Sequence, residues 1–239
     1  MQYLDATFAT PEENLACDEA LLDLCEDGHD EEVLRVWEPN QHFVVLGYSN
    51  KVSTGVFESV CRSRKIQILR RCTGGGTVLQ GPGCLNYSLI LRIDNSGSLA
   101  TIAGTNSFVM NRHRKMIQSV IGKEVKVEGR TDLVIGDLKF SGNSQRRRSR
   151  CLLFHGTFLL NFELALISEL LPMPSRQPDY RASRTHDQFI ANLELPARTV
   201  KEALCGSWQA SIHLDSPPND AIARLVSERY SRPEWTAKF

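Results

Sequence analysis

The run from Leu85 to Ile93 alternates apolar and polar side chains, which limits the chain to folds that contain a half-buried strand. The apolar side of the run consists of Leu85, Tyr87, Leu89, Leu91 and Ile93. The other side presents Asn86, Ser88 and Arg92. A period of two residues is typical of a β-strand with one face in the core and the other toward solvent. We therefore expect a sheet that contains this strand.

Helical and strand patterns follow one another irregularly along the rest of the chain. The capping box Thr10-Pro-Glu-Glu13 predicts a helix from Pro11 to Asp27. Further helices are predicted over residues 54–64, 101–121, 162–171, 199–208 and 220–229. Further strands are predicted over 33–37 and 43–46, joined by a turn, and over 66–69, 125–127, 133–135, 138–140 and 151–160, while the polar stretch 94–98 breaks the sheet. Because a regular βαβ alternation is absent, we expect an α+β fold: a single domain, residues 1–239, with a mixed or antiparallel sheet flanked by helices.

The composition excludes several classes of protein. Twenty-eight basic and 28 acidic residues give a formal net charge of zero, which does not fit a protein that coats nucleic acid. No apolar run is long enough for a membrane span and polar residues follow Met1, so a cytoplasmic protein without membrane contact is expected. The seven cysteines form no CxxC pair and the histidines lack metal-ligand spacing, so we expect mostly reduced, buried thiols, and neither a disulfide framework nor a metal site.

The most informative segment is Arg70-Arg-Cys-Thr-Gly-Gly-Gly-Thr-Val78, which lies between two predicted strands and is named the glycine loop here. Three consecutive glycines fit a turn with positive φ or a close approach of backbone to a ligand. Their N–H groups can bind an anion, and the neighbouring arginines and threonine supply further donors. The segment lacks the spacing of a P-loop or a dinucleotide loop. A flexible hairpin tip is the alternative interpretation.

Lys139 is the candidate for a second cationic group. The stretch from Asp132 to Asn143 has the pattern of a hairpin, with Gly136-Asp137 at its turn and the lysine on the returning strand. Ser141-Gly142-Asn143 follows and predicts a small polar bend that brings backbone near a ligand. A solvated lysine at a sheet edge is the alternative.

Three segments occur in the same order as the motifs of a known family, and the intervals between them are similar. They are Arg70 to Val78, Gly136-Asp-Leu-Lys-Phe-Ser-Gly-Asn-Ser-Gln-Arg146 and His155-Gly-Thr-Phe-Leu-Leu160. With them the chain resembles the lipoate-protein ligase A family of the biotin/lipoate A/B protein ligase superfamily, whose motifs are RRxxGGGxV, a GxxKxxGxxxR-like stretch and HG(T/S). The helix Asn14 to Ala20 and the strand pair from Arg35 to Gly47 extend the resemblance over most of the chain. It implies a biotin/lipoate ligase (class II synthetase-like) catalytic fold.

The resemblance also implies a two-step reaction. ATP and lipoate, or octanoate, would form an acyl-adenylate and pyrophosphate, and the acyl group would then pass to a lysine of a lipoyl carrier domain. The carrier would be of the 2-oxoacid dehydrogenase E2 or glycine-cleavage H-protein type. Mg²⁺ is expected with the triphosphate, held mainly by phosphate oxygens and water.

By motif position, the resemblance assigns expected roles to single residues. Lys139 would contact the carboxyl and α-phosphate oxygens, because charge develops there during adenylate formation. The residues expected to bind the adenylate or border its pocket are Arg71, Thr73, Gly74, Gly75, Gly76, Val78, Gln80, Asp132, Gly142, Asn143, His155 and Gly156. Val78 would lie against the acyl chain and Asp132 near the nucleotide. For His155, a structural hydrogen bond is the alternative to a catalytic role.

The chain departs from the family pattern in two respects. Gln80 stands where many members have histidine, which keeps a hydrogen-bonding side chain and removes a titratable one. The sequence also ends at Phe239 without the C-terminal domain of the longer ligases. The protein is therefore expected either to act alone or to need a separate small accessory subunit.

Two other functions remain open at this stage. In an acyltransferase of the same superfamily, Cys151 would be a nucleophile that carries the acyl group as a thioester without ATP. Cys151 and His155, four positions apart on a strand, are too distant to form a thiolate pair, so Lys139 would have to activate the thiol. A non-catalytic binder would use the basic run from Gln145 to Arg150 to dock nucleic acid or an acidic protein. The segments 179–181 and 184–186 are interpreted as polar surface.

Overall fold

The computed structural model describes residues 1–94 and 96–239 as an α+β fold with one large mixed sheet and one small sheet, so the predicted fold class is confirmed. The predicted break at 94–98 includes Asn95, which lies outside the described residues. From edge to edge, the large sheet contains β11 (Ile212–His213), β1 (Gln2–Asp5), β2 (Val33–Trp37), β6 (Cys84–Arg92), β10 (Cys151–Leu159), β9 (Leu138–Arg147), β8 (Asp132–Ile135) and β7 (Lys126–Glu128). β1 runs parallel to β2 and β11, and the other neighbours pair antiparallel.

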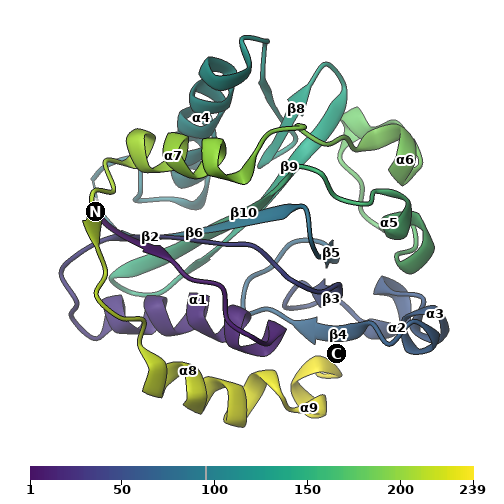
Figure 1. The fold of residues 1–239 in the computed structure, drawn as a ribbon, viewed down its shortest axis with the longest axis horizontal. Helices are drawn as coiled ribbons and strands as arrows, with labels where there is room; N and C mark the ends of the chain where they lie inside the picture. The colour runs from purple at the N-terminus through teal and green to yellow at the C-terminus, as the bar shows by residue number, and fades with distance from the viewer. Residues whose placement is uncertain (95) are drawn as a thin grey trace.

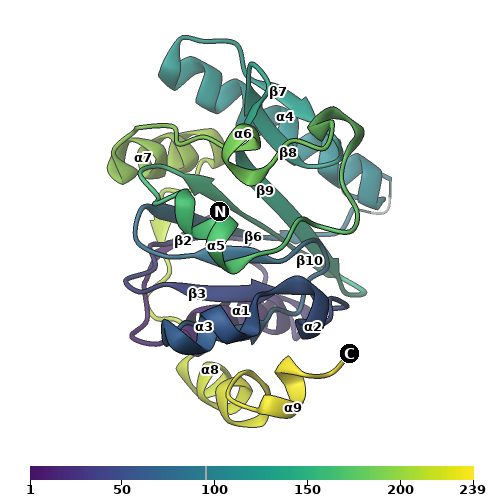
Figure 2. The ribbon, with the colours of Figure 1, turned by 90° about the vertical axis from the view of Figure 1, so that its right-hand side faces the viewer.

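Helices cover both faces of the large sheet (Figure 1). One face packs against α4 (Ile102–Ile121) and α7 (Ala197–Trp208), and the other against α1 (Pro11–Glu26), with α8 (Asn219–Leu225) beyond it. The small sheet has the order β4 (Gln67–Arg70), β3 (Phe43–Leu46), β5 (Val78–Gln80). The short helices are α2 (Val52–Gly55), α3 (Glu58–Ser63), α5 (Ala165–Leu170), α6 (His186–Phe189) and α9 (Pro233–Thr236), with a 3₁₀ turn at Asp179–Arg181 and a π turn at Val226–Tyr230. Figure 2 shows α2 and α3 beside the small sheet.

Strand β6 lies near the middle of the sheet, where both of its faces are buried. Leu89 packs under α4, while Ile90 on the opposite face packs with α1. Asn86 and Ser88, expected to face solvent, are 5% and 0% exposed. The expectation of a single buried face is therefore wrong, because α1 covers the polar side of the alternation.

Most predicted elements form, but several boundaries and pairings differ. The capping box at Thr10 is present: the Thr10 hydroxyl oxygen accepts from the backbone N–H of Glu13, and the Glu13 carboxylate accepts from the backbone N–H of Thr10. The strands over 33–37 and 43–46 exist but enter different sheets, and the helix predicted over 54–64 is interrupted between α2 and α3. β9 extends far beyond the predicted 138–140. None of the helices within the described ranges combines the length and apolarity needed to cross a lipid bilayer.

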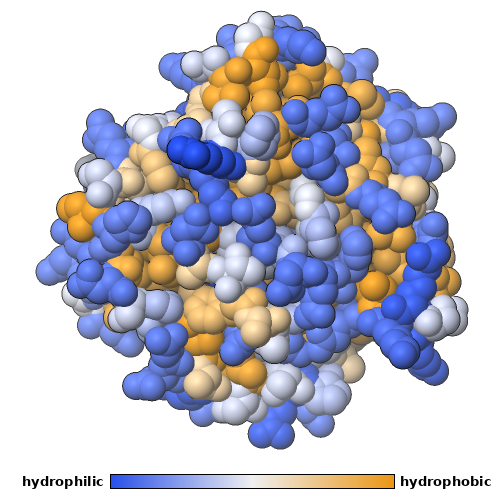
Figure 3. All heavy atoms as spheres, in the orientation of Figure 1, coloured by the Kyte–Doolittle hydropathy of each residue, from blue (hydrophilic) through white to orange (hydrophobic). Residues whose placement is uncertain are grey.

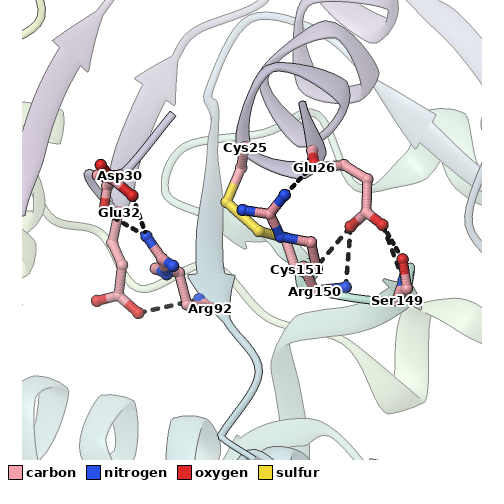
Figure 4. Close-up of a disulfide and its surroundings, with 8 residues drawn as sticks. All are labelled: Cys25, Glu26, Asp30, Glu32, Arg92, Ser149, Arg150 and Cys151. Atoms are coloured by element: carbon pink, nitrogen blue, oxygen red, sulfur yellow. Dashed lines mark hydrogen bonds and ion pairs between the residues drawn. A yellow bond between two sulfur atoms is a disulfide. The ribbon is translucent and has the colours of Figure 1, made fainter. Parts of the chain in front are cut away.

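A disulfide joins the end of α1 to the start of β10, so one pair departs from the expectation of mostly reduced thiols, which the other five cysteines meet. Cys25 and Cys151 are bonded and buried, with their Cα atoms 6.3 Å apart (Figure 4). Beside this bond, the Glu26 carboxylate accepts hydrogen bonds from the backbone N–H groups of Arg150 and Cys151. Because the two cysteines are 126 positions apart, spacing in the sequence could not reveal the pair. The other five cysteines are free thiols.

Candidate active site

Lys139 on β9 is held beside Asp132 of the neighbouring strand β8, with Nζ 2.8 Å from Oδ1. Lys139 and Gly142 are three positions apart, so a regular strand would place them on opposite faces. The register of β8 against β9 shifts between Leu133 and Val134, and this bulge turns Lys139 to the face of Gly142. A Cβ on Gly142 would lie 2.9 Å from Lys139 Nζ. The missing side chain therefore makes room for the ammonium.

The glycine loop connects β4 to β5 and is packed from one side only. A Cβ on Gly47 would lie 2.1 Å from the Gly75 carbonyl oxygen, so only glycine fits under the loop. Gly75 has a φ of +88°, which glycine adopts at little cost. Cβ atoms on Gly74 and Gly76 would meet no atom within 4 Å. This side of the loop is open, so its backbone can approach a ligand.

Arg71 is turned into the glycine loop instead of outward toward a ligand. Its Nη2 donates to the carbonyl oxygens of Gly74, at 2.6 Å, and Gly76, at 2.8 Å. Its Nε donates to Thr73 Oγ1 at 2.9 Å. Burial lowers the pKa of Arg71 to about 10, which leaves the guanidinium charged near neutral pH. Arg71 therefore shapes the loop from within, and the expected contact with the adenylate would come from the loop that it supports.

His155 links the glycine loop to helix α1. Its Nε2 lies 2.7 Å from Thr73 Oγ1, and its Nδ1 lies 3.1 Å from Asp18 Oδ2. The other oxygen of Asp18 pairs with the buried Arg35 at 2.6 Å. Burial by itself would raise the pKa of Asp18, but Arg35 and His155 hold it below its usual value. Because a carboxylate only accepts hydrogen bonds, Asp18 fixes a proton of His155 on Nδ1.

Lys139 and the glycine loop lie along one face of the sheet. Ser144, the cross-strand partner of His155, donates to the Gly74 carbonyl oxygen at 3.0 Å. Gly142 and Ser144 are two positions apart on β9, so they share a face and are separated by about 7 Å along the strand. The ammonium and the open glycines are thus close enough to contact one small ligand.

Gln80 belongs to a buried hydrogen-bonded group next to Gly142. Its Nε2 donates to Thr157 Oγ1 at 2.7 Å, and its Oε1 accepts from Asn86 Nδ2 at 2.9 Å. Thr157 is the cross-strand partner of Gly142 in the β9–β10 ladder. Val78, at the start of β5, is 37% exposed and remains available for an apolar group.

Asn143 and Gly156 lie on the opposite face of the sheet, away from Lys139. Asn143 accepts a hydrogen bond from the Tyr87 hydroxyl at 2.5 Å and donates to the Thr131 carbonyl at 2.7 Å. A Cβ on Gly156 would lie 1.6 Å from Asn143 Oδ1, so this glycine makes room for the amide. On this face, Asn143 connects β9 to the residue before β8, and Gly156 packs against its amide. Neither residue borders the face of Lys139. Residues 141–143 continue β9, so the predicted bend is wrong.

Tyr180, interpreted from the sequence as surface, reaches the site. Its hydroxyl donates to Asp132 Oδ2 at 2.7 Å, so Asp132 is shared between Tyr180 and Lys139. The neighbouring Arg184 donates to the carbonyl oxygen of Asp137 at 3.0 Å. Tyr180 and Asp132 are far apart in the sequence, and no motif contains both of them. Their contact is therefore visible only in the tertiary structure.

The basic run occupies the end of β9 and the turn to β10, where its arginines already have partners. Arg146 donates to the Cys72 carbonyl oxygen at 3.0 Å, which ties β9 to the glycine loop. Arg148 pairs with Asp23 of α1 at 2.5 Å. These arginines hold elements together, so the run is not the free basic patch that a nucleic-acid binder needs.

Two further observations concern metal binding and the apolar side chains at the surface. Among residues 1–94 and 96–239, no three histidine, cysteine or acidic side chains are placed to hold a metal ion. On the face seen in Figure 3, apolar side chains lie in separate patches among hydrophilic ones.

Comparisons with known proteins agree on one family. The model of the lipoyl protein ligase A/B catalytic domain matches residues 10–204. Lipoate-protein ligase A subunit 1 of Thermoplasma acidophilum is 25% identical over 238 residues, covering 93% of this chain and 90% of the relative. Octanoyltransferase LipM of Geobacillus kaustophilus is 24% identical over 279 residues, covering 99% of this chain and 98% of the relative.

Solved structures show the same fold. A crystal structure of lipoate-protein ligase A bound with ATP matches with a TM-score of 0.85 at 22% identity, covering 99% of this chain and 98% of that one. The bi-partite lipoate protein ligase of T. acidophilum, studied with its E2 lipoyl domain, matches with a TM-score of 0.80 at 20% identity, covering 100% and 98%.

Proposed function

Because this chain belongs to the lipoyl protein ligase A/B catalytic domain family, we propose that it is an ATP-dependent lipoate-protein ligase. In the first step, the lipoate carboxylate attacks the α-phosphorus of ATP, and the bond to the leaving pyrophosphate breaks. In the second, the amine of a carrier lysine attacks the acyl carbonyl, AMP leaves with the electron pair of the C–O bond, and the amine loses a proton to solvent. An octanoyl group would follow the same course.

The distance between Cys151, the candidate nucleophile, and Lys139 carries this proposal. Cys151 is bonded to Cys25 and lies at the far end of the sheet, about 25 Å from Lys139 by the rise of a strand. Burial raises the pKa of the Cys17, Cys72 and Cys84 thiols to about 12 and also raises those of Cys61 and Cys205. A thiol with a raised pKa is a poor nucleophile. These environments favour direct transfer from an adenylate over a thioester intermediate.

The site offers the groups that adenylate formation needs. Lys139 supplies an ammonium that can contact the carboxyl and α-phosphate oxygens in turn, and the backbone of the glycine loop is open to a ligand at Gly74 and Gly76. Val78 is exposed for contact with the acyl chain. Mg²⁺ would be held by phosphate oxygens and water. It would balance charge on the triphosphate.

We propose lipoyl carrier domains of the E2 or H-protein type as acceptors. A similar relative is named as one subunit of a ligase, and a similar structure is described as bi-partite with an E2 lipoyl domain. A separate accessory subunit is therefore part of the proposal for this chain. We also propose a cytoplasmic location, where ATP and carrier domains occur together.

Lipoate-dependent exchange of pyrophosphate into ATP tests the first step. Wild-type protein should catalyse the exchange, alone or with the accessory subunit, and Lys139→Ala should lose it. Lys126→Ala is the matched control, because Lys126 lies on β7 of the same sheet with its side chain 51% exposed. Equal loss in both lysine variants, or normal exchange with Lys139→Ala, would contradict the proposal.

Octanoyl transfer between carriers without ATP is the alternative, favoured by the similarity to octanoyltransferase LipM over nearly the whole chain. It requires reduction of the Cys25–Cys151 bond before Cys151 could act. An octanoylated carrier supplied without ATP distinguishes the two reactions. Transfer that depends on Cys151 and on a reductant would support the alternative.

A further inference from the structure

We propose that Tyr180 is a positioning residue that acts through Asp132 on the ammonium of Lys139. The Tyr180 hydroxyl occupies Asp132 Oδ2 at 2.7 Å, which leaves Oδ1 for Lys139 Nζ at 2.8 Å. The carboxylate thus has a defined partner on each oxygen and cannot rotate without breaking a hydrogen bond. With Asp132 fixed, Nζ is kept over Gly142 on the face of the glycine loop.

The hydroxyl of Tyr180 remains a donor at any physiological pH. Partial burial of the ring and the nearby charge of Asp132 raise the pKa of Tyr180 above its usual value. A phenol that stays protonated gives a directional hydrogen bond to a carboxylate, which is stronger than a bond between neutral groups.

The segment that carries Tyr180 is itself anchored to the β8–β9 hairpin. Arg184 donates to the Tyr180 carbonyl at 2.9 Å and to the Asp137 carbonyl at 3.0 Å. Farther along, Ala191 N donates to the Lys139 carbonyl oxygen at 2.9 Å. The backbone of Lys139 and the partner of its side chain are therefore both held by residues 180–191.

Buried Arg181 fixes the turn in which Tyr180 lies. Its Nε donates to the Arg184 carbonyl oxygen at 2.9 Å, and its guanidinium lies 4.5 Å from the centre of the Phe189 ring. This arrangement makes Tyr180 a fixed support for Asp132, in contrast to a side chain at the end of a mobile loop.

Chemical labelling of Lys139 tests the positioning directly and does not depend on the proposed function. With limiting acetic anhydride and detection by mass spectrometry, Tyr180→Phe should raise the labelling rate of Lys139 about threefold, because the ion pair with Asp132 loses its support. Lys126 in the same sample is the internal control. Tyr3→Phe is the matched variant, because it removes a tyrosine hydroxyl that lies 3.4 Å from Asp5, far from the site. An unchanged or slower rate at Lys139 would overturn the inference.

A double-mutant cycle separates positioning from general damage to the fold. In the Asp132→Asn background, Tyr180→Phe should no longer alter the labelling of Lys139, because the residue through which it acts has changed. An equal effect in both backgrounds would overturn the inference.

The kinetic consequence rests on the proposed ligase function. In pyrophosphate exchange, Tyr180→Phe should lower kcat about fivefold and leave the KM for ATP nearly unchanged, because the ammonium acts mainly in the transition state. Wild-type protein without exchange would refute the ligase proposal, and the labelling result would still decide the role of Tyr180. Active wild-type protein with a normal Tyr180→Phe kcat would refute the positioning role.

Discussion

At the scale of single residues, the polar motif side chains Arg71 and His155 form hydrogen bonds inside the protein that hold the glycine loop in place. Arg71 holds two carbonyl oxygens of the glycine loop, and His155 connects Thr73 to Asp18. The open backbone positions of the loop are Gly74 and Gly76, and Lys139 lies on the same face of the sheet. A motif of charged residues therefore does not by itself say which of them contact the substrate.

Arg71→Lys tests this division of roles. Lysine keeps the charge but cannot donate to Gly74, Gly76 and Thr73 in one plane, so the loop loses its internal support. Loss of two hydrogen bonds to a charged group predicts a fall of at least about tenfold in pyrophosphate exchange. Arg64→Lys, on the exposed end of α3, is the control. Equal activity of the two variants would contradict the role of Arg71.

Asp18 should make folding stability depend on pH. Because Arg35 and His155 hold its folded pKa below the usual value, Asp18 stabilises the fold above the unfolded pKa of about 4. This contribution is lost as pH falls through the lower folded pKa. Asp18→Asn leaves Arg35 buried without its counter-charge, so urea unfolding at pH 7 should show a loss of about 3–5 kcal/mol.

The difference between wild type and Asp18→Asn should shrink as the pH is lowered below 4. Asp23→Asn is the comparison, because burial raises the pKa of Asp23, so its ionisation contributes with the opposite sign. A constant difference between wild type and Asp18→Asn at all pH values would refute the linkage.

At the scale of elements, the sequence predicts most helices and strands but not their pairing or coverage. The alternation around Leu89 correctly predicts β6, yet the polar side is covered by α1, a contact that no local pattern encodes. The bulge that turns Lys139 toward Gly142 is likewise set by the register between two strands. That Lys139 and the glycine loop share one face of the sheet could be expected only from the resemblance to a family. The two segments are about 60 positions apart, and no local pattern indicates that they lie together.

The disulfide between α1 and β10 should contribute to stability and not to catalysis. Closing a loop of 126 positions stabilises the fold by up to about 4–5 kcal/mol in the chain-entropy model. Cys25→Ser and Cys151→Ser should therefore lower the unfolding temperature by similar amounts and keep acyl transfer at 25 °C. If Cys151→Ser alone abolished transfer, Cys151 would be a nucleophile after all.

At the scale of the whole molecule, the C-terminal segment forms hydrogen bonds with helix α1 and with the start of the glycine loop. Tyr230 donates to the buried Glu19 of α1 at 2.8 Å, and Arg70 at the start of the glycine loop donates to the carbonyl oxygen of Trp235 at 3.0 Å. We propose on this basis that residues 1–239 fold as one domain. Thermal unfolding should then give a single transition by both fluorescence and circular dichroism, whereas two separated transitions would contradict it.

The sequence could supply the fold class and the family, because both rest on the order of elements and on local motifs. It could not supply Asp18 and Tyr180 as partners of His155 and Asp132, because each pair joins segments far apart in the chain. The motif residues of the site can therefore be predicted from the sequence, but the residues that hold them in place cannot.

The intact mass of an apo lipoyl domain after incubation with this protein tests the central claim most directly. With lipoate, ATP and Mg²⁺, and with any accessory subunit present, the domain should gain one lipoyl group. It should gain none without ATP, and Lys139→Ala should fail where Lys126→Ala succeeds. Synthetic lipoyl-AMP should replace lipoate and ATP together. Gain of an acyl group from an acylated carrier without ATP, together with no gain from lipoyl-AMP, would contradict the account.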